Sequence, residues 1–195
     1  MDDTLSGYAY GDPSLPPSPV TIEDLARLKQ AVGLDDEDMA ALRRAGRILS
    51  PRADVVVDSW RQAVAAVPHL LAAYASAEGV IDDRYRVRVR ERFKRWIDDL
   101  CFRPWDQPWL DYQHEIGARH THLAKNKADA AAAVGHIPLR YLIAFTAVVN
   151  DRVKPFLVES GAAAEEVEAM HRAWCKAALL SVTLWTRPYV ADSAW

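Results

Sequence analysis

Trp109-Leu-Asp-Tyr112-Gln-His114-Glu-Ile116-Gly-Ala-Arg-His120 is the stretch of sequence that decides the fold. At about 100° per residue, Trp109, Tyr112, Ile116 and His120 lie on one side of a helix. The pattern therefore predicts a helix that presents a histidine on its apolar side. A buried polar nitrogen needs a partner, because an unpaired polar group inside a protein costs free energy. His120 is either a core histidine bonded to a carbonyl or water, or a ligand for something bound.

The rest of the chain indicates an all-α protein. Residues 1–20 are rich in Gly, Pro and Ser, which predicts a loop. Short turns of helix are predicted within residues 68–82. The start of the segment 84–100 alternates with period two, as a strand would, but its apolar residues continue at helical spacing to Leu100. In the first half of the chain, longer helices are predicted over 21–32, over 35–49, and in the segment that follows Ser50-Pro51, where Ser50 would be the cap. A further helix is predicted from Asp82 or Asp83 to Leu100. In the second half, helices are predicted after the breaks at Pro104 and Pro108, from Pro138 past Phe156, and from Gly161 to Thr186.

Composition places the chain among ordinary globular proteins. It has 195 residues, of which 50% are hydrophobic and 26% charged, and its net charge of -3 gives no reason to expect a nucleic-acid partner. No apolar run approaches the roughly 20 residues of a membrane span, and the acidic start is unlike a signal peptide. Cys101 and Cys175 match neither a metal motif nor a disulfide framework. A cytoplasmic protein that does not contact membranes is expected.

Large aromatic rings stand on the inner faces of four different predicted helices. They are Trp60, Phe93, Phe145 and Trp185. Such rings fill a core, or they form the walls of a pocket for a flat apolar ligand. Haem is a ligand of that kind, and one neutral imidazole is a sufficient protein bond to its iron.

Several motifs together resemble the protoglobins, single-domain relatives of the globin domains in globin-coupled sensors. The resemblance covers nearly the whole chain, and the His136 and His120 motifs are highly specific in combination. The motifs are Gly7-Tyr-Ala-Tyr-Gly11, the helix of Trp60, Arg90-Glu-Arg-Phe93, Trp109-Leu-Asp-Tyr-Gln113, Gly117-Ala-Arg-His120, His136-Ile-Pro-Leu-Arg-Tyr-Leu-Ile-Ala-Phe145, Pro155-Phe-Leu and Trp195.

The resemblance implies an expanded globin fold, a 3-over-3 helical sandwich with an extra N-terminal helix and a leading loop. The domain boundaries expected from it are 1–20 for the loop and 21–195 for a single haem domain. His120 would be the proximal ligand of a five-coordinate iron. No Cys-x-x-Cys-His motif occurs, so the haem is expected to be haem b, bound without a covalent link. The family's leading loop helps to bury the haem, and gas reaches the iron through narrow apolar tunnels.

The resemblance also implies which residues surround the haem. Trp60, Phe93, Phe145 and Val149 match the family's distal pocket, where they would keep the site dry and narrow. The family usually has a tyrosine directly after the tryptophan, whereas this chain has Arg61. The other residues expected to contact haem are Val89, Tyr112, Ile116, Ile137, Leu142 and Trp185.

Two interpretations of Arg61 remain open. The side chain can extend outward, with its charged head in water, because a buried unpaired guanidinium is costly. Alternatively, it lies beside the iron and stabilises bound oxygen or assists peroxide cleavage. For the arginines of 84–95, the alternatives are a solvated face, nucleic-acid binding, or contacts with the haem propionates, for which Arg92 is the candidate. His114 and His122 are expected to lie in solvent.

The function expected from this resemblance is reversible binding of O₂, CO or NO, for gas binding or sensing. The alternative is a haem enzyme that detoxifies NO or peroxynitrite or acts as a peroxidase, with a capacity for non-native carbene transfer. A third possibility is a helical sensor that has lost its haem. Members of the family tend to dimerise through their long late helices, so a homodimer through residues 138–186 is expected.

Overall fold

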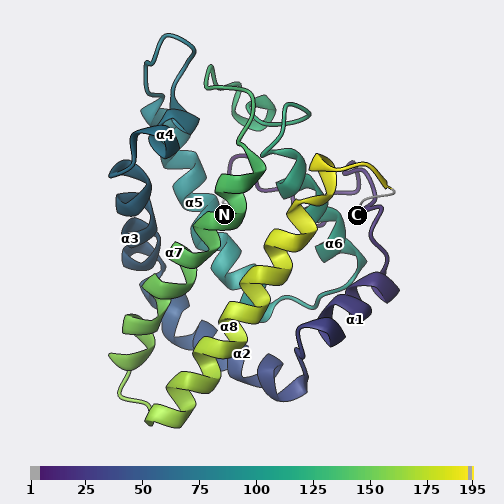
Figure 1. The fold of residues 1–195 in the computed structure, drawn as a ribbon, viewed down its shortest axis with the longest axis vertical. Coiled ribbons are helices and arrows are strands. Elements are labelled where there is room, and N and C mark those ends of the chain that lie inside the picture. Colours follow the sequence, from purple (N-terminus) through teal and green to yellow (C-terminus); the bar gives the residue numbers. More distant parts are fainter. Residues whose placement is uncertain (1–4, 193–194) are drawn as a thin grey trace.

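The computed structural model describes residues 5–192 and 195, so the first four residues of the predicted loop lie outside the described part. The described chain is built from helices and loops (Figure 1), and its only β-structure is an isolated bridge between Ala75 and Ile81. The all-α prediction is therefore confirmed. The α-helices are α1 (Ile22–Ala31), α2 (Asp36–Leu49), α3 (Ala53–Ala65), α4 (Pro68–Leu71), α5 (Asp83–Phe102), α6 (Gln107–Ala118), α7 (Leu139–Val158) and α8 (Ala164–Trp185), with short 3₁₀ turns η1 (Ser50–Arg52), η2 (Ala72–Tyr74), η3 (Lys127–Asp129) and η4 (Arg187–Tyr189).

Helices α1, α2, α5 and α6 begin with a side-chain cap. Thr21 and Asp35 each close a capping box with the aspartate three residues later, and Asp82 accepts a hydrogen bond from the Tyr85 backbone N–H at 2.8 Å. The prediction for Ser50 was wrong. Ser50 and the proline after it form the 3₁₀ turn η1, and the Ser50 hydroxyl donates to the Asp98 carboxylate instead of capping α3.

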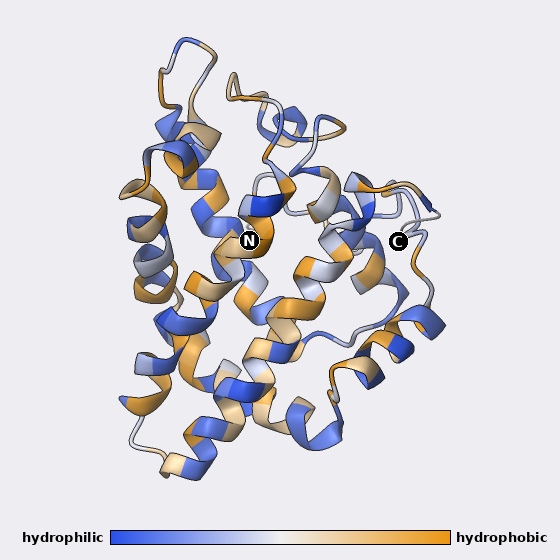
Figure 2. Cartoon of the chain, viewed as in Figure 1, coloured by the Kyte–Doolittle hydropathy of each residue, from blue (hydrophilic) through white to orange (hydrophobic). Residues whose placement is uncertain are grey.

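Helices α7 and α8 run side by side across the front of the molecule and are connected at the bottom of the view (Figure 1). Helix α8 also packs against α2 and α6, while α5 packs against α2 and α3. Hydrophobic and hydrophilic residues alternate along the long helices, as expected for helices with one buried face (Figure 2). None of the described helices has the length and apolar character needed to cross a membrane; the expected cytoplasmic location stays a prediction.

Three tryptophans form the centre of the core. Trp60, Trp96 and Trp174 come from α3, α5 and α8, and their ring centroids lie 5.7 to 6.2 Å apart. Each buries most of its surface, so together they supply a large hydrophobic contribution to stability. This cluster fixes the three helices relative to one another on one side of the cavity described below.

One glycine determines how closely α6 approaches α8. A Cβ at Gly117 would lie 2.9 Å from the backbone oxygen of Trp185 and 3.0 Å from its Cα. A backbone cannot move aside as a flexible side chain can, so only glycine fits here. The absence of a side chain at Gly117 brings the end of α6 directly against the residue that packs on His120.

Candidate functional site

His120 lies just beyond the end of α6. The helix ends at Ala118, so the prediction of a continuous helix through His120 was wrong by two residues. Arg119 keeps right-handed helical dihedrals, however, and the imidazole still follows the apolar side of α6. The His120 Nδ1 lies 2.7 Å from the backbone oxygen of Ile116, so it donates its proton there. This assigns the free lone pair to Nε2.

Burial keeps the His120 imidazole neutral. It lowers the pKa of His120 to about 4, and the nearby charges of Lys125 and Arg119 act in the same direction. The hydrogen bond to Ile116 opposes this shift but does not cancel it. At neutral pH the side chain therefore presents an unprotonated Nε2, which is the form that binds metals.

The His120 ring is held in place from two sides. Trp185 stacks on it, with ring centroids 5.6 Å apart and an interplanar angle of 15°. The Trp185 indole N–H donates in turn to the buried Gln113 amide oxygen at 2.8 Å. The Tyr189 hydroxyl lies within hydrogen-bond distance of the backbone oxygens of His120, at 3.0 Å, and Ile137, at 2.7 Å. These contacts fix the direction in which Nε2 points.

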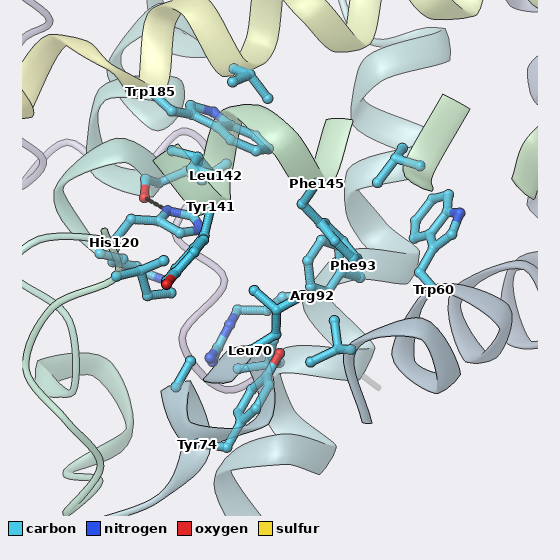
Figure 3. A pocket seen from close by; sticks show the side chains of 18 of the residues that line it. Trp60, Leu70, Tyr74, Arg92, Phe93, His120, Tyr141, Leu142, Phe145 and Trp185 are labelled. Carbon is cyan, nitrogen blue, oxygen red and sulfur yellow. Dashed lines mark hydrogen bonds between the residues drawn. The ribbon is translucent and has the colours of Figure 1, made fainter. Parts of the chain in front are cut away.

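A cavity of about 320 Å³ lies beside His120 and is lined by residues of α3 to α8 and of the turn η2. Figure 3 shows the imidazole on one side of it and the rings of Trp60, Phe93 and Phe145 on the other. The structure brings every residue assigned to the haem site from the sequence to this one cavity. These residues are Trp60, Arg61, Val89, Arg92, Phe93, Tyr112, Ile116, His120, Ile137, Leu142, Phe145, Val149 and Trp185.

The wall opposite His120 is apolar and comes from three helices. Trp60 of α3 and Phe93 of α5 meet edge to face, with centroids 6.1 Å apart. Phe145 and Val149 of α7 complete this wall, and Val149 is almost fully buried. Closely packed rings leave little room for water, so a small apolar molecule would be favoured over water there.

Arg61 lines the cavity next to this wall, but its guanidinium group pairs with the Asp58 carboxylate. Its Nη1 lies 3.4 Å from Asp58 Oδ1, and the Asp58 carboxylate is itself 42% exposed. Asp58 also receives hydrogen bonds from Arg90 Nε and Nη2 at 2.7 and 2.8 Å. The cation therefore belongs to an ion network at the edge of the molecule, in agreement with the outward interpretation.

Arginines and the N-terminal loop border another part of the cavity. Arg92 binds the Asp129 carboxylate at 2.5 and 3.0 Å and donates to the backbone oxygen of Ser6 at 3.0 Å. Arg119 donates to the backbone oxygen of Gly7 and pairs with Glu115 at 2.7 Å. Both cations therefore hold the loop against the cavity, and each already has a carboxylate partner.

The N-terminal loop also has a buried polar anchor. The Tyr8 hydroxyl lies 2.8 and 2.9 Å from the two carboxylate oxygens of Asp99, which lines the cavity and is only 1% exposed. Burial raises the pKa of the Asp99 carboxyl. Tyr8 and Tyr10 both pack edge to face against Tyr112. The tyrosines of the Gly7–Gly11 motif thus attach the loop to α5 and α6.

Several residues of the cavity were missed from the sequence. Tyr74, Asp99, Arg119 and Tyr141 line it, and so do two exposed histidines, His69 and His136. Tyr74 comes from a short turn that has no periodicity, so no pattern could place it. The expectation for His114 was also wrong: it is half-buried, and its Nδ1 has no hydrogen-bond partner among the described residues. His122 is exposed, as predicted.

The residues present fit a haem. A neutral imidazole with a free Nε2 faces an apolar cavity whose volume lies in the range of ligand sites in proteins. Arginines stand at its border, where acidic groups of a ligand can pair with them. Neither Cys101 nor Cys175 lines the cavity. The arrangement can hold a flat apolar molecule and bind its metal through one nitrogen.

Comparisons with known proteins agree with this geometry. The family model described as Protoglobin matches residues 21–195. Among solved structures, the chain is similar to the globin domain of the Geobacter sulfurreducens globin-coupled sensor, with a TM-score of 0.65 and 14% identity. That match covers 86% of this chain and 98% of the other, and it shows a shared globin fold. A comparison with curated proteins found no match.

Proposed function

Since the chain belongs to the protoglobin family, we propose that it is a haem protein that reversibly binds diatomic gases, with His120 Nε2 as the proximal ligand of the iron. The observation that supports this most directly is the His120 imidazole itself. It is neutral, its Nδ1 is engaged by Ile116, and its Nε2 is left free beside an apolar cavity. Most buried polar atoms in proteins are hydrogen-bonded, so a nitrogen that is open toward a cavity is suited to bind a ligand there.

The proposed cofactor is haem b without a covalent link. This is supported by the absence of cysteine from the cavity wall and by the absence of a Cys-x-x-Cys-His motif in the sequence. Arg92 and Arg119 are the candidates to pair with the propionates. Arg92 would then share its charge between a propionate and Asp129, which it already binds.

When bound, the haem supplies an iron at which O₂, CO or NO is held, and the chain's own residues determine what reaches it. His120 orients the iron through one bond, and its stacking on Trp185 keeps that bond in a fixed direction. The Trp60, Phe93 and Phe145 rings exclude water and restrict the site to small molecules. The N-terminal loop, anchored through Tyr8 and Asp99, closes part of the border.

Gas binding is favoured over peroxide chemistry by the position of Arg61. A peroxidase-like site needs a charged or basic group free to act on the bound peroxide. The Arg61 guanidinium instead pairs with Asp58, in an ion network that also contains Arg90. We therefore propose binding or sensing, and not turnover of a substrate, as the role of this site.

The experiment that tests the proposal is titration of the haem-free protein with hemin. We expect the Soret band to saturate at one haem per chain. After reduction, the spectrum should be that of a five-coordinate haem iron. His120→Ala should lose this band or shift it, and added imidazole should restore it, because imidazole replaces the missing ligand. The matched control is His122→Ala, which removes an exposed histidine two residues away. Identical spectra for the two variants would exclude His120 as the ligand.

We also propose a homodimer through residues 138–186. Three exposed apolar side chains on α7 and α8 support this surface: Ile143 at 49%, Val158 at 57% and Leu179 at 46% exposed. The molar mass measured by sedimentation equilibrium tests it, and a monomer at all concentrations would contradict it.

A further inference from the structure

We propose that Tyr74 is the residue that donates a hydrogen bond to the gas ligand and so sets the preference of this site for oxygen over CO. The inference rests on the proposed haem function. It concerns a side chain that comes from a short turn and not from any of the long helices. Donation of one hydrogen bond to a polar ligand stabilises it selectively, since CO accepts such bonds poorly.

Tyr74 is the last residue of η2, the 3₁₀ turn that follows α4. Its side chain lines the cavity, and Figure 3 shows it together with Leu70 and Arg92, on the far side from the His120 ring. It also lines a small crevice together with Arg61 and Val64 of α3. Tyr74 therefore lies next to the wall that carries Trp60, which is the wall that faces the gas.

The Tyr74 hydroxyl is available as a donor. No hydrogen bond of this hydroxyl to another described residue is present, and burial raises the pKa of the phenol despite the nearby charges of Arg61, Arg86 and Arg92. A phenol with a raised pKa stays protonated at neutral pH and keeps its O–H to donate. The hydroxyl is not enclosed by protein atoms, because Tyr74 is half-buried and lines the cavity, so a polar ligand in the cavity can accept a hydrogen bond from it.

The turn that carries Tyr74 is fixed before any ligand arrives. The backbone oxygen of Tyr74 accepts from the Asp82 N–H at 2.9 Å, and its ring packs on Tyr85 with centroids 5.7 Å apart. On either side, Ala73 and Ala75 offer their backbone oxygens to the Lys125 ammonium at 2.9 Å and to the Val134 N–H at 2.8 Å. A donor held this way loses little conformational entropy when it bonds to the gas.

Two of the cations that line the cavity are already paired with carboxylates. Arg61 pairs with Asp58, and Arg92 binds Asp129. The Trp60 indole nitrogen is buried without a partner, but Figure 3 shows it on the side of the ring that faces away from Phe93 and Phe145. Tyr141 also lines the cavity; its ring packs on His69 with centroids 4.9 Å apart, and the view of Figure 3 draws it on the same side as His120. These positions leave Tyr74 as the phenol next to the gas-facing wall.

The test compares Tyr74→Phe with Tyr141→Phe in the haem-loaded protein. Both variants lose one hydroxyl from the same cavity and keep the ring. We expect oxygen to dissociate about tenfold faster from Tyr74→Phe, because the variant loses one neutral hydrogen bond to the bound oxygen. The infrared C–O stretch of its CO complex should move to higher frequency, because a positive dipole near CO lowers that stretch. Tyr141→Phe should leave both quantities close to those of the unaltered protein.

The outcomes separate the two proposals. If the unaltered protein shows no Soret band with hemin, the haem function and the role of Tyr74 both fail. If haem and gas bind but Tyr74→Phe leaves oxygen release and the C–O stretch unchanged, only the role of Tyr74 is overturned. It is also overturned if Arg61→Leu produces these changes in its place. Should Tyr74→Phe fail to fold, the C–O stretch is measured in D₂O instead: a D₂O shift that persists in Arg61→Leu supports Tyr74 as the donor, and no shift in the unaltered protein overturns the proposal.

Discussion

The wall that carries His120 is fixed by hydrogen bonds and stacking, whereas the opposite wall consists of apolar rings with one phenol at its border. On the first wall, Ile116, Gln113 and Trp185 determine both the orientation and the protonation of the imidazole. On the second wall, Trp60 and Phe93 make only van der Waals and edge-to-face contacts with their neighbours. The first wall fixes the direction of one nitrogen, which suits a metal ligand, and the second leaves little room for water.

This difference separates two properties of the site. Under the proposed function, affinity for haem would depend on the His120 wall, where the loss of one contact would disturb the proposed ligand itself. Discrimination among gases would depend on the opposite wall, because that wall would face the bound gas. Changes on the two walls should therefore affect different measurements, and the variants below test this separation.

The largest effect is expected for Gly117→Ala, on the His120 wall. The new methyl group would meet the Trp185 backbone at 2.9 to 3.0 Å and force α6 away from α8. We expect a loss of about 3 kcal/mol in the free energy of unfolding, at the upper end for an overpacked contact. Haem should also dissociate faster, because the displaced Trp185 ring would no longer stack on the His120 ring and hold it in place. Urea denaturation and haem transfer to an acceptor protein measure the two effects.

Gly135→Ala is the matched control for that variant. A Cβ at Gly135 meets no atom within 4 Å, so its free energy of unfolding should change by no more than about 0.5 kcal/mol. If Gly117→Ala unfolds at the same urea concentration as Gly135→Ala, the close approach of α6 to α8 is not what orients His120.

A smaller effect is expected for Lys125→Met, on the side of Tyr74. Burial lowers the pKa of the Lys125 ammonium to about 8, whereas in the unfolded chain it is about 10.4. Above pH 8 the folded chain therefore loses this proton before the unfolded chain does. The cost of the buried charge disappears as the pH rises, and this group should add about 2 kcal/mol to the free energy of unfolding between pH 8 and pH 9.5.

Lys125→Met should lack this rise, and Lys127→Met, which removes an exposed ammonium nearby, should keep it. Urea denaturation at the two pH values measures the difference. If the free energy of unfolding depends on pH equally in Lys125→Met and in the unaltered chain, the Lys125 ammonium that binds the turn of Tyr74 carries no cost of burial. Haem affinity at pH 7 should change less than in Gly117→Ala, in keeping with the separation between the two walls.

Much of the fold could be predicted from periodicity, because a helix with one buried face repeats its apolar residues at a spacing that the sequence shows directly. The helix that precedes His120 and the rings of Trp60, Phe93 and Phe145 were found this way, and all of them line the cavity. The end of α6 was misplaced because Arg119 keeps right-handed helical dihedrals after the helix has ended, so the apolar spacing continues to His120. The role of Ser50 could not be predicted, since its hydroxyl bonds to Asp98, a residue distant in sequence.

The sequence by itself determined the helices, the apolar side of each, and the histidine that stands on one of them, since these depend on neighbours a few residues apart. Only the tertiary structure decided how the polar groups at the cavity are used. Arg61 pairs with Asp58, Arg92 pairs with Asp129, and the Tyr74 hydroxyl has no hydrogen bond to another residue of the described chain. The physical reason is that the cost of a buried polar group depends on which partners reach it in space, and spacing along the chain does not specify them.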